Sequence, residues 1–428
     1  MRRSVSGIRV VGRATAIIAG TLGSLCAQTT DTGPPQRTIP IRDSVKSEVA
    51  ESRYRLGALR LQPSLTIKQL EYNNNVFGSS DHPVSDYTST VAGGVRWIAP
   101  MGTKLFLRGD FLPEYHWYAR NSDQRSLGGV YRAAFLALFN RMSIETDGTR
   151  SATLPLLSSE AQRVVRASTT AGRFRTEVDI LPRISVFGGA AAQRYRFRPA
   201  SDHSSDFEVS QLDRRDFQAD AGLRYHVTTF FDVSAAVEST RSRFVAQSNV
   251  RDNRGTAYLL GVHYDLPRVY MNVSAGRRMG RPLDGSSFPS YSTATGSWFL
   301  SYFLAAPAEV QAYGHRSVVN GLAVETPYFF ETRSGLALNW QAGRHLIFRT
   351  FGELGNNRYS NPIAVGTSRV TRNDQVTTYG GGFSLPVYRG LWFTVLASRD
   401  RYNSDIPEFD RSLLRITSGL TYRTRAPE

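Results

Sequence analysis

The sequence predicts an all-β protein, a transmembrane antiparallel up-and-down β-barrel of about 18 strands with both termini in the periplasm. Three observations lead to this prediction. Segments of roughly 12 to 15 residues alternate between polar and apolar positions, which is the period of a strand with two unlike faces. Brief turns alternate with longer polar loops, and aromatic residues gather near the segment ends. Only 41% of the residues are hydrophobic, which argues against a bundle of membrane-spanning helices.

The first 27 residues have the pattern of a secretory signal peptide. Several arginines precede a weakly polar run, 14–27, that is too short to cross a bilayer as a helix, which needs roughly 20 apolar residues. We therefore expect export, cleavage near Ala27 and residence in the cell outer membrane. A lipidated Cys26 fits less well because Leu25 stands where a small residue is expected, and residues 4–6 fit the twin-arginine pattern poorly.

The rest of the chain divides into a leader and a barrel. Residues 28–54 are polar without a sustained period, so we interpret them as a flexible periplasmic leader, followed by the predicted barrel at 55–428. Cys26 is the single cysteine, so the mature chain would lack disulfides and thiol metal sites. Cleavage removes four arginines and no acid, which lowers the formal net charge from +16 to +12. An excess of basic over acidic residues is compatible with binding to an acidic surface, to nucleic acid or to an anionic permeant.

The first strand is expected at 61–72, within the stretch Arg55–Phe77. It ends on three asparagines, Asn73 to Asn75. Asparagine tolerates left-handed backbone and caps turns with its side chain, so we interpret the run as turn-forming. The alternative is a sugar or calcium contact in the first external loop.

Expected turns and loops then divide the chain into hairpins. Proline cannot donate to a strand ladder and presets a turn. Short turns are expected at 99–102, 140–141, 181–183, 228–229, 266–268, 306–307, 343–344 and 385–388. Longer polar loops are expected at 121–126, 155–163, 199–211, 247–254, 281–290, 320–326, 359–371 and 403–409. Short turns on the periplasmic side and long loops outside are typical of outer-membrane barrels, and with a last strand at 411–423 the count reaches about 18.

The two faces of each predicted strand differ in chemistry. Around Arg173 the odd positions are charged and the even positions are mostly apolar, as at Phe174. A soluble sandwich or propeller also alternates, but strands in soluble proteins usually have about 5–6 residues. That alternative does not explain the signal peptide together with the asymmetry of turns and loops.

The opening stretch also carries a resemblance. Arg60-Leu61, Pro63-Ser64-Leu65 and then 72–77 (Tyr-Asn-Asn-Asn-Val-Phe) lead into an Asp-Tyr-Thr strand at 86–91. This series resembles the start of outer-membrane β-barrel porins often encoded beside exopolysaccharide export genes. The resemblance implies a barrel of similar length with a role in polysaccharide export or biosynthesis. The tail after Tyr422 departs from the usual C-terminal outer-membrane signal, which has aromatic residues at or near the last position.

No motif of a catalytic or cofactor site stands out. The chain has no G-x-S-x-G elbow, no H-E-x-x-H, no P-loop and no G-x-G-x-x-G, so we expect no enzyme activity, no metal and no cofactor. Its seven histidines are scattered over different segments. A hydrolase site assembled from distant strands of the barrel is a less favoured alternative.

Arginines on the faces assigned to the lumen are the candidate permeant contacts, because guanidinium groups match carboxylates and phosphates. These are Arg173, Arg175, Arg194, Arg196, Arg224, Arg333, Arg349 and Arg415. Carboxylates also fall on those faces, so the competing interpretation is that the arginines pair with them across strands. These are Glu114, Glu177, Asp179, Asp216, Asp220, Glu238, Glu331 and Glu353.

We therefore expect an outer-membrane pore or conduit for exopolysaccharide or anionic solutes. The alternative from another class is a structural or surface-interaction barrel whose lumen is closed. The expected partners are outer-membrane lipid and lipopolysaccharide, the barrel-assembly machinery, and polysaccharide with periplasmic export components. Nucleic acid is not expected.

Overall fold

A computed structural model describes residues 41–52, 54–76, 83–153, 165–199, 209–246, 248–305, 307–323, 325–343, 346–388 and 390–422. The predicted signal peptide, most of the leader, the loop expected at 155–163 and the C-terminal tail lie outside these residues. None of the described helices is long and apolar enough to span a bilayer.

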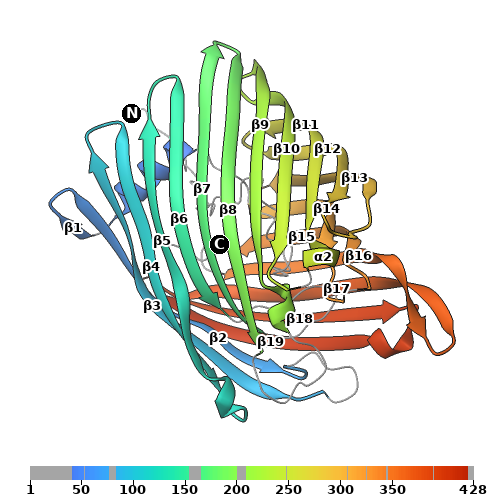
Figure 1. The fold of residues 1–428 in the computed structure, drawn as a ribbon. Helices are drawn as coiled ribbons and strands as arrows, with labels where there is room; N and C mark the ends of the chain where they lie inside the picture. The colour runs from blue at the N-terminus through green and yellow to red at the C-terminus, as the bar shows by residue number, and fades with distance from the viewer. Residues whose placement is uncertain are drawn as a thin grey trace, which may run out of the picture.

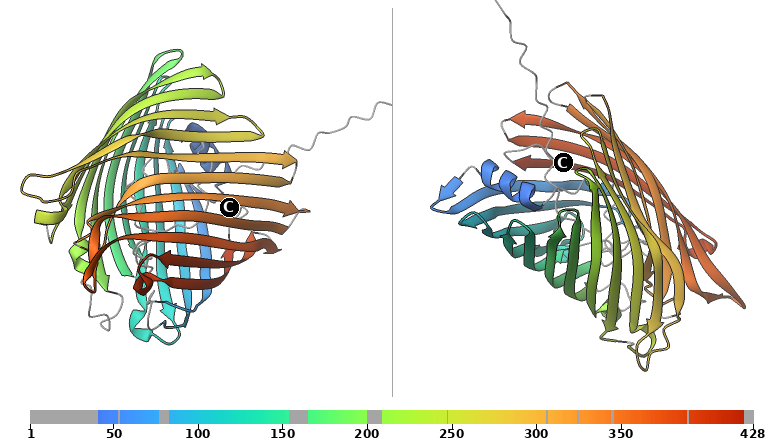
Figure 2. Two further views of the ribbon diagram at one scale, coloured as in Figure 1. Left: turned by 90° about the vertical axis from the view of Figure 1, so that its right-hand side faces the viewer. Right: turned by 90° about the horizontal axis from the view of Figure 1, so that it is seen from above.

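The described chain forms a closed antiparallel barrel of 18 strands, β2 to β19 (Figures 1 and 2). Each strand pairs with the next one along the chain, and β19 closes the wall by pairing with β2, where Arg415 lies opposite Asn73. A short strand, β1, forms an extra hairpin arm on β2. The barrel and its strand number confirm the prediction.

The strands are longer than those of most soluble sheets. Their bounds are β1 (Tyr54–Leu56), β2 (Leu59–Asn73), β3 (Asp86–Met101), β4 (Leu105–Tyr118), β5 (Ser126–Leu138), β6 (Met142–Thr153), β7 (Val165–Leu181), β8 (Ile184–Pro199), β9 (Arg214–Thr228), β10 (Phe231–Phe244), β11 (Asn253–Asp265), β12 (Val269–Pro282), β13 (Tyr291–Ala305), β14 (Ala308–Asn320), β15 (Tyr328–Ala342), β16 (Leu346–Val365), β17 (Ser368–Tyr388), β18 (Leu391–Ser404) and β19 (Arg411–Tyr422). Short helical segments are α1 (Ile41–Glu51), η1 (Ser122–Gln124), η2 (Val209–Leu212), α2 (Ser248–Arg251) and η3 (Pro407–Phe409).

The two edges of the barrel differ as predicted. One edge, here called the turn edge, holds the short connections at 102–104, 139–141, 182–183, 229–230, 266–268, 306–307, 343–345 and 389–390. Most connections at the opposite loop edge are longer. Because the strand number is even, β2 begins and β19 ends at the turn edge (Figure 1).

Two prolines that were expected in turns lie inside strands. Pro100 pairs with Phe106 and Pro386 pairs with Trp392, each close to its hairpin end. A proline removes only one donor from the ladder, which a strand end tolerates. The turn after Pro100 is made by Gly102, whose φ of 75° is a backbone conformation that favours glycine.

The prediction of a loop at 359–371 is wrong. Strand β16 continues to Val365 and β17 starts at Ser368, so this hairpin extends past its neighbours (orange, at the right of Figure 1). The polar residues 359–361 and the proline at Pro362 suggested a loop. The structure instead accommodates them with a shift of register between Arg358 and Pro362.

The asparagine run makes a turn, as the favoured interpretation predicted. The backbone N–H of Asn75 donates to Asn73 Oδ1 at 2.9 Å. The backbone N–H of Leu414 on β19 donates to Asn74 Oδ1 at 3.0 Å. Asparagine side chains therefore replace the ladder where β2 ends.

Helix α1 is a feature that the sequence analysis did not predict. Its apolar stripe places Val45 against Ile98, Leu136 and Leu138, on the inward faces of β3 and β5 near the turn edge. Ile41 and Val49 pack against the same cluster. The helix thus lies inside the barrel, within the segment that was interpreted as a flexible leader.

Candidate functional site: the charged lumen wall

The inner wall of the barrel carries charged side chains of both signs, whereas the outer wall is apolar over much of its height. On β4 the outward Phe111 is 52% exposed, while the inward Arg108 is 7% and Glu114 is 5% exposed. Facing residues on neighbouring antiparallel strands have Cβ atoms roughly 5 Å apart, so opposite charges on one face meet. The lumen wall is therefore the candidate site.

A cluster of buried charges centred on β6 lies near α1. Glu145 Oε1 accepts hydrogen bonds from three guanidinium groups, those of Arg108 (3.1 Å), Arg132 (3.2 Å) and Arg173 (3.3 Å). Asp147 Oδ1 accepts from Arg132 Nη2 and from Arg173 Nε, both at 2.9 Å. The register places Asp147 directly opposite Arg173. The arginines of this cluster are paired with the carboxylates of neighbouring strands.

Helix α1 extends this cluster across the turn edge of the lumen. Glu48 Oε1 lies 3.4 Å from Arg108 Nη1, and the Glu48 backbone carbonyl accepts a hydrogen bond from Gln62 on β2 at 3.2 Å. Apolar contacts through Val45 and these polar contacts hold the helix against the wall. The helix consequently occupies part of the lumen near the turn edge.

A serine, a histidine and an aspartate meet on β8, β9 and β10. Ser185 Oγ lies 2.8 Å from His226 Nε2, and His226 Nδ1 lies 2.6 Å from Asp232 Oδ1. This order of contacts is that of a catalytic triad. However, Ser185 is 0% exposed and its hydroxyl also donates to Asp179 Oδ1 at 2.7 Å. A hydroxyl that is buried and donates to a carboxylate is poorly placed to act as a nucleophile, and the contacts of this group join three strands.

Among the ion pairs of the described residues, three with a lysine or arginine stay accessible from the lumen. In the pair Arg96–Asp110 the Nε–Oδ1 distance is 2.8 Å and the side chains are 40% and 21% exposed. Arg224 binds Glu177, with side chains 34% and 32% exposed. Lys68 contacts the buried Glu114 and is itself 44% exposed. These three cations are accessible to a solute in the lumen.

Further along the wall, β14 to β19 carry a second group of buried pairs. Arg333 donates to Asn357 Oδ1 at 2.7 Å and to Glu331 Oε2 at 3.3 Å. Arg415 donates to Asp400 Oδ2 at 2.8 Å. These contacts pair neighbouring strands and neutralise the guanidinium groups locally.

Six of the eight predicted lumen arginines face inward. Arg173, Arg175, Arg224, Arg333, Arg349 and Arg415 lie on the same strand faces as the inward carboxylates, and all eight carboxylates face inward as expected. Of the six, Arg173, Arg224, Arg333 and Arg415 are paired with carboxylates on other strands, Arg333 through Glu353. The competing interpretation, pairing across strands, therefore holds for these four.

The prediction for Arg194 and Arg196 is wrong, because both are exposed on the outer face of β8. The inward positions of this strand hold Tyr195 and Phe197, and Phe197 is 3% exposed. Phe197 belongs to an apolar cluster with Leu212, which belongs to η2 at the loop edge. Contact with this loop segment makes the inner face of β8 apolar at that height, so polar character alone did not identify the lumen face.

Sequence reasoning missed the central residues of the β6 cluster. A signal was present, since Glu145 and Asp147 stand two residues apart on one face of a strand, but nothing in the sequence paired them with Arg108 and Arg132. Within the described ranges no group of three or more histidine, cysteine, aspartate or glutamate side chains could hold a metal ion. Among the histidines, His315 contacts Glu331 on the next strand at 2.9 Å.

Comparisons with known proteins give the fold. No family model matches the sequence, and no curated protein matches it. The solved structure of OccK2 (OpdF) from Pseudomonas aeruginosa is similar over 85% of this chain and 97% of its own, with a TM-score of 0.51 and 10% identity. OccAB3 from Acinetobacter baumannii is also similar, over 85% of this chain and 99% of its own, with a TM-score of 0.48 and 12% identity. A BenF-like porin from Pseudomonas fluorescens Pf-5 is similar over 85% of this chain and 98% of its own, with a TM-score of 0.48 and 11% identity. At such identity the likeness to OccK2 concerns the fold, which is that of outer-membrane porins.

Proposed function

We propose that this protein is an outer-membrane pore for small hydrophilic solutes. The observation that carries the proposal is the inverted polarity of the barrel. Outward-facing Leu260 and Leu336 are 70% and 62% exposed, whereas the inward Asp400 is 0% exposed. Such a surface is unfavourable in water and suits a barrel whose outer wall contacts lipid and whose inner wall contacts water.

Within this pore, we propose that anionic solutes contact the accessible cations Lys68, Arg96 and Arg224. Their exposed side chains present ammonium and guanidinium groups to the lumen, and arginine binds carboxylates and phosphates through two parallel hydrogen bonds. Each also has a carboxylate neighbour, so attraction for anions is local and the selectivity is modest. The buried arginines of the β6 cluster do not contact permeants.

The resemblance of the opening stretch supports a further proposal about the physiological setting. Residues 60–77 are similar to porins encoded beside exopolysaccharide export genes, so we propose that the pore works with a polysaccharide pathway and its periplasmic components. Removing the gene and measuring secreted polysaccharide tests this step. If secretion is unchanged while solute uptake falls, the proposed pore is supported and the proposed role in a polysaccharide pathway is refuted.

Planar bilayers test the pore itself. We expect single-channel conductance from the purified protein, and a reversal potential that shifts toward cation preference when Arg224→Gln removes an accessible positive charge. Arg401→Gln is the matched control, because Arg401 is exposed on the outward face of β18 and binds only Asn403 among the described residues. A barrel that inserts without conducting would support the closed, structural alternative instead.

A further inference from the structure

An arginine-rich surface lies on the outer wall, at the loop-edge ends of β8, β9 and β10. It comprises Arg194, Arg196, Arg198, Arg215, Arg241 and Arg243, here called the outer arginine patch. All six side chains are exposed. The patch contributes six positive charges to a chain whose formal net charge is +16.

The register places like charges directly opposite one another in this patch. Arg215 faces Arg194 on one side and Arg243 on the other. One step toward the turn edge, Arg241 faces Arg254 on β11. Like charges that face each other across a strand pair destabilise a sheet by a few tenths to about 1 kcal/mol each. A bound anion would offset this repulsion.

The protein itself supplies little negative charge here. Within the described residues, the outward positions of β7 to β12 hold no carboxylate. Arg198 lies 3.6 Å from Asp213. Within the same residues, the side chains of Arg194, Arg215 and Arg243 make neither a hydrogen bond nor an ion pair. Among the described residues, nothing supplies a counter-charge for these three guanidinium groups, so a bound anion would complement them.

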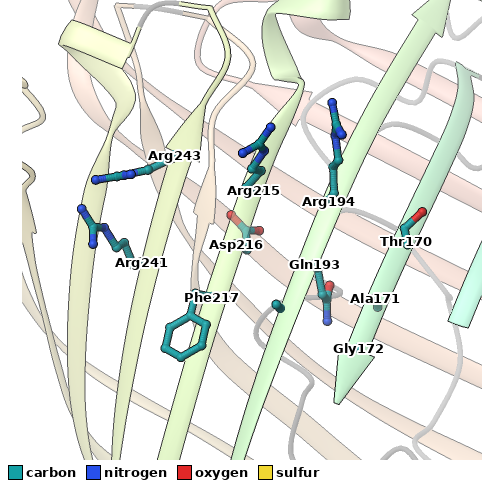
Figure 3. Close-up of a pocket in the computed structure, with 11 residues that line it drawn as sticks. Thr170, Ala171, Gly172, Gln193, Arg194, Arg215, Asp216, Phe217, Arg241 and Arg243 are labelled. Atoms are coloured by element: carbon teal, nitrogen blue, oxygen red, sulfur yellow. The ribbon is translucent and has the colours of Figure 1, made fainter. Parts of the chain in front are cut away.

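A groove on the outer wall accompanies the patch. It has a volume of about 650 Å³ and is lined by Thr170, Gly172, Ala192 and Phe217 together with arginines of the patch. Small side chains create the space, since a Cβ added to Gly172 would meet nothing within 4 Å. In Figure 3, Arg194 and Arg215 extend from adjacent strands in the same direction, while Phe217 points the other way. The groove therefore has a cationic end and an apolar end.

We propose that the outer arginine patch binds the phosphate groups of a lipopolysaccharide molecule, whose acyl chains lie along the apolar wall below it. The inference rests on the outer-membrane location in the proposed function. Below the patch, outward-facing Leu223 and Val237 are 55% and 44% exposed, which suits acyl chains. Phosphate esters match the paired N–H donors of arginine, and a lipid of this kind presents its phosphates at the height where the apolar surface ends.

Binding of purified lipid A tests the proposal. The variant Arg194→Gln/Arg215→Gln/Arg243→Gln removes the facing row, and we expect its affinity for lipid A, measured by native mass spectrometry in detergent, to fall by about tenfold or more. The control Arg316→Gln/Arg358→Gln/Arg401→Gln removes the same charge from outward positions on alternate strands, β14, β16 and β18, and should bind as the unchanged protein does. Enzymatically dephosphorylated lipid A should bind weakly to every variant.

Three results would overturn the inference. They are equal binding by both triple variants, no preference for phosphorylated lipid A, and equal binding of a soluble anionic polysaccharide that lacks acyl chains. Conductance is measured on the same preparations. A variant that loses lipid A binding and still conducts supports the lipid site. If the unchanged protein binds lipid A without conducting, the lipid site is supported and the proposed pore function is refuted. Retention of the folded barrel is checked by circular dichroism.

Discussion

Replacing Glu145 by glutamine should destabilise the barrel far more than replacing Glu177 by glutamine, although each change removes one lumen carboxylate. Glu145 is 4% exposed and accepts hydrogen bonds from Arg108, Arg132 and Arg173. Breaking a buried charge pair costs roughly 3–5 kcal/mol, and because Asp147 still pairs with two of these arginines we expect about 3 kcal/mol. Glu177 and its partner Arg224 are each about one-third exposed, so solvent screens the pair and we expect less than about 1 kcal/mol.

Urea unfolding in lipid vesicles, followed by the fluorescence of the five tryptophans, measures both free energies. The same two variants separate structure from permeation in planar bilayers. Glu177→Gln should increase anion preference because it frees the accessible Arg224, whereas Glu145→Gln should leave the reversal potential unchanged. Equal losses of stability, or a change of selectivity in Glu145→Gln alone, would refute the division of the lumen wall into buried structural pairs and accessible contacts.

Other features of the barrel lead to three predictions. Val45→Asp places a carboxylate in the apolar contact of α1, and release of the helix should raise single-channel conductance; unchanged conductance would mean that α1 does not restrict the lumen. Ser185→Ala removes hydrogen bonds to two neighbours and should lower the unfolding free energy by about 1–3 kcal/mol, while any ester hydrolysis by the purified protein stays the same. Loss of hydrolysis in that variant would instead favour an enzyme. Gly102→Ala should cost about 1 kcal/mol because φ is 75°, whereas Gly148→Ala, also without a Cβ contact, should cost less in the same unfolding measurement.

The hairpin plan of this barrel could be predicted from sequence because it depends on local signals. A two-residue period identifies strands, and glycine or proline identifies turns, so the strand number and the two unlike edges follow without any tertiary information. Predictions failed where a local signal has two structural outcomes. Pro386 ends a strand as readily as it occupies a turn, and the polar residues 359–371 lengthen a hairpin instead of forming a loop.

Which face of a strand points into the lumen, and which residues pair with each other, depend on tertiary contacts that no local sequence pattern reveals. On β8 the inner face is apolar because residues of η2 pack on Phe197, and this contact reverses the usual assignment of Arg194 and Arg196. The apolar stripe of α1, with Ile41, Val45 and Val49 four residues apart, was a readable helical signal in a segment otherwise interpreted as a leader. Its position inside the barrel could not be predicted from the sequence, because the helix is held there by contacts with residues of β3 and β5.

The basic composition of the chain acquires a different meaning once the faces are assigned. A net charge of +16 suggests an anion-selective pore as long as the arginines are taken to face the lumen. In the structure, Arg173, Arg333 and Arg415 of the lumen are matched by carboxylates on neighbouring strands, while Arg215 and its facing arginines lie on the outer wall. Charge on the outer wall cannot attract a solute through the lumen, but it can hold a phosphorylated lipid. Anion preference should therefore depend on a few accessible pairs such as Arg224–Glu177, and removing the outer arginines should change lipid binding while the reversal potential stays constant.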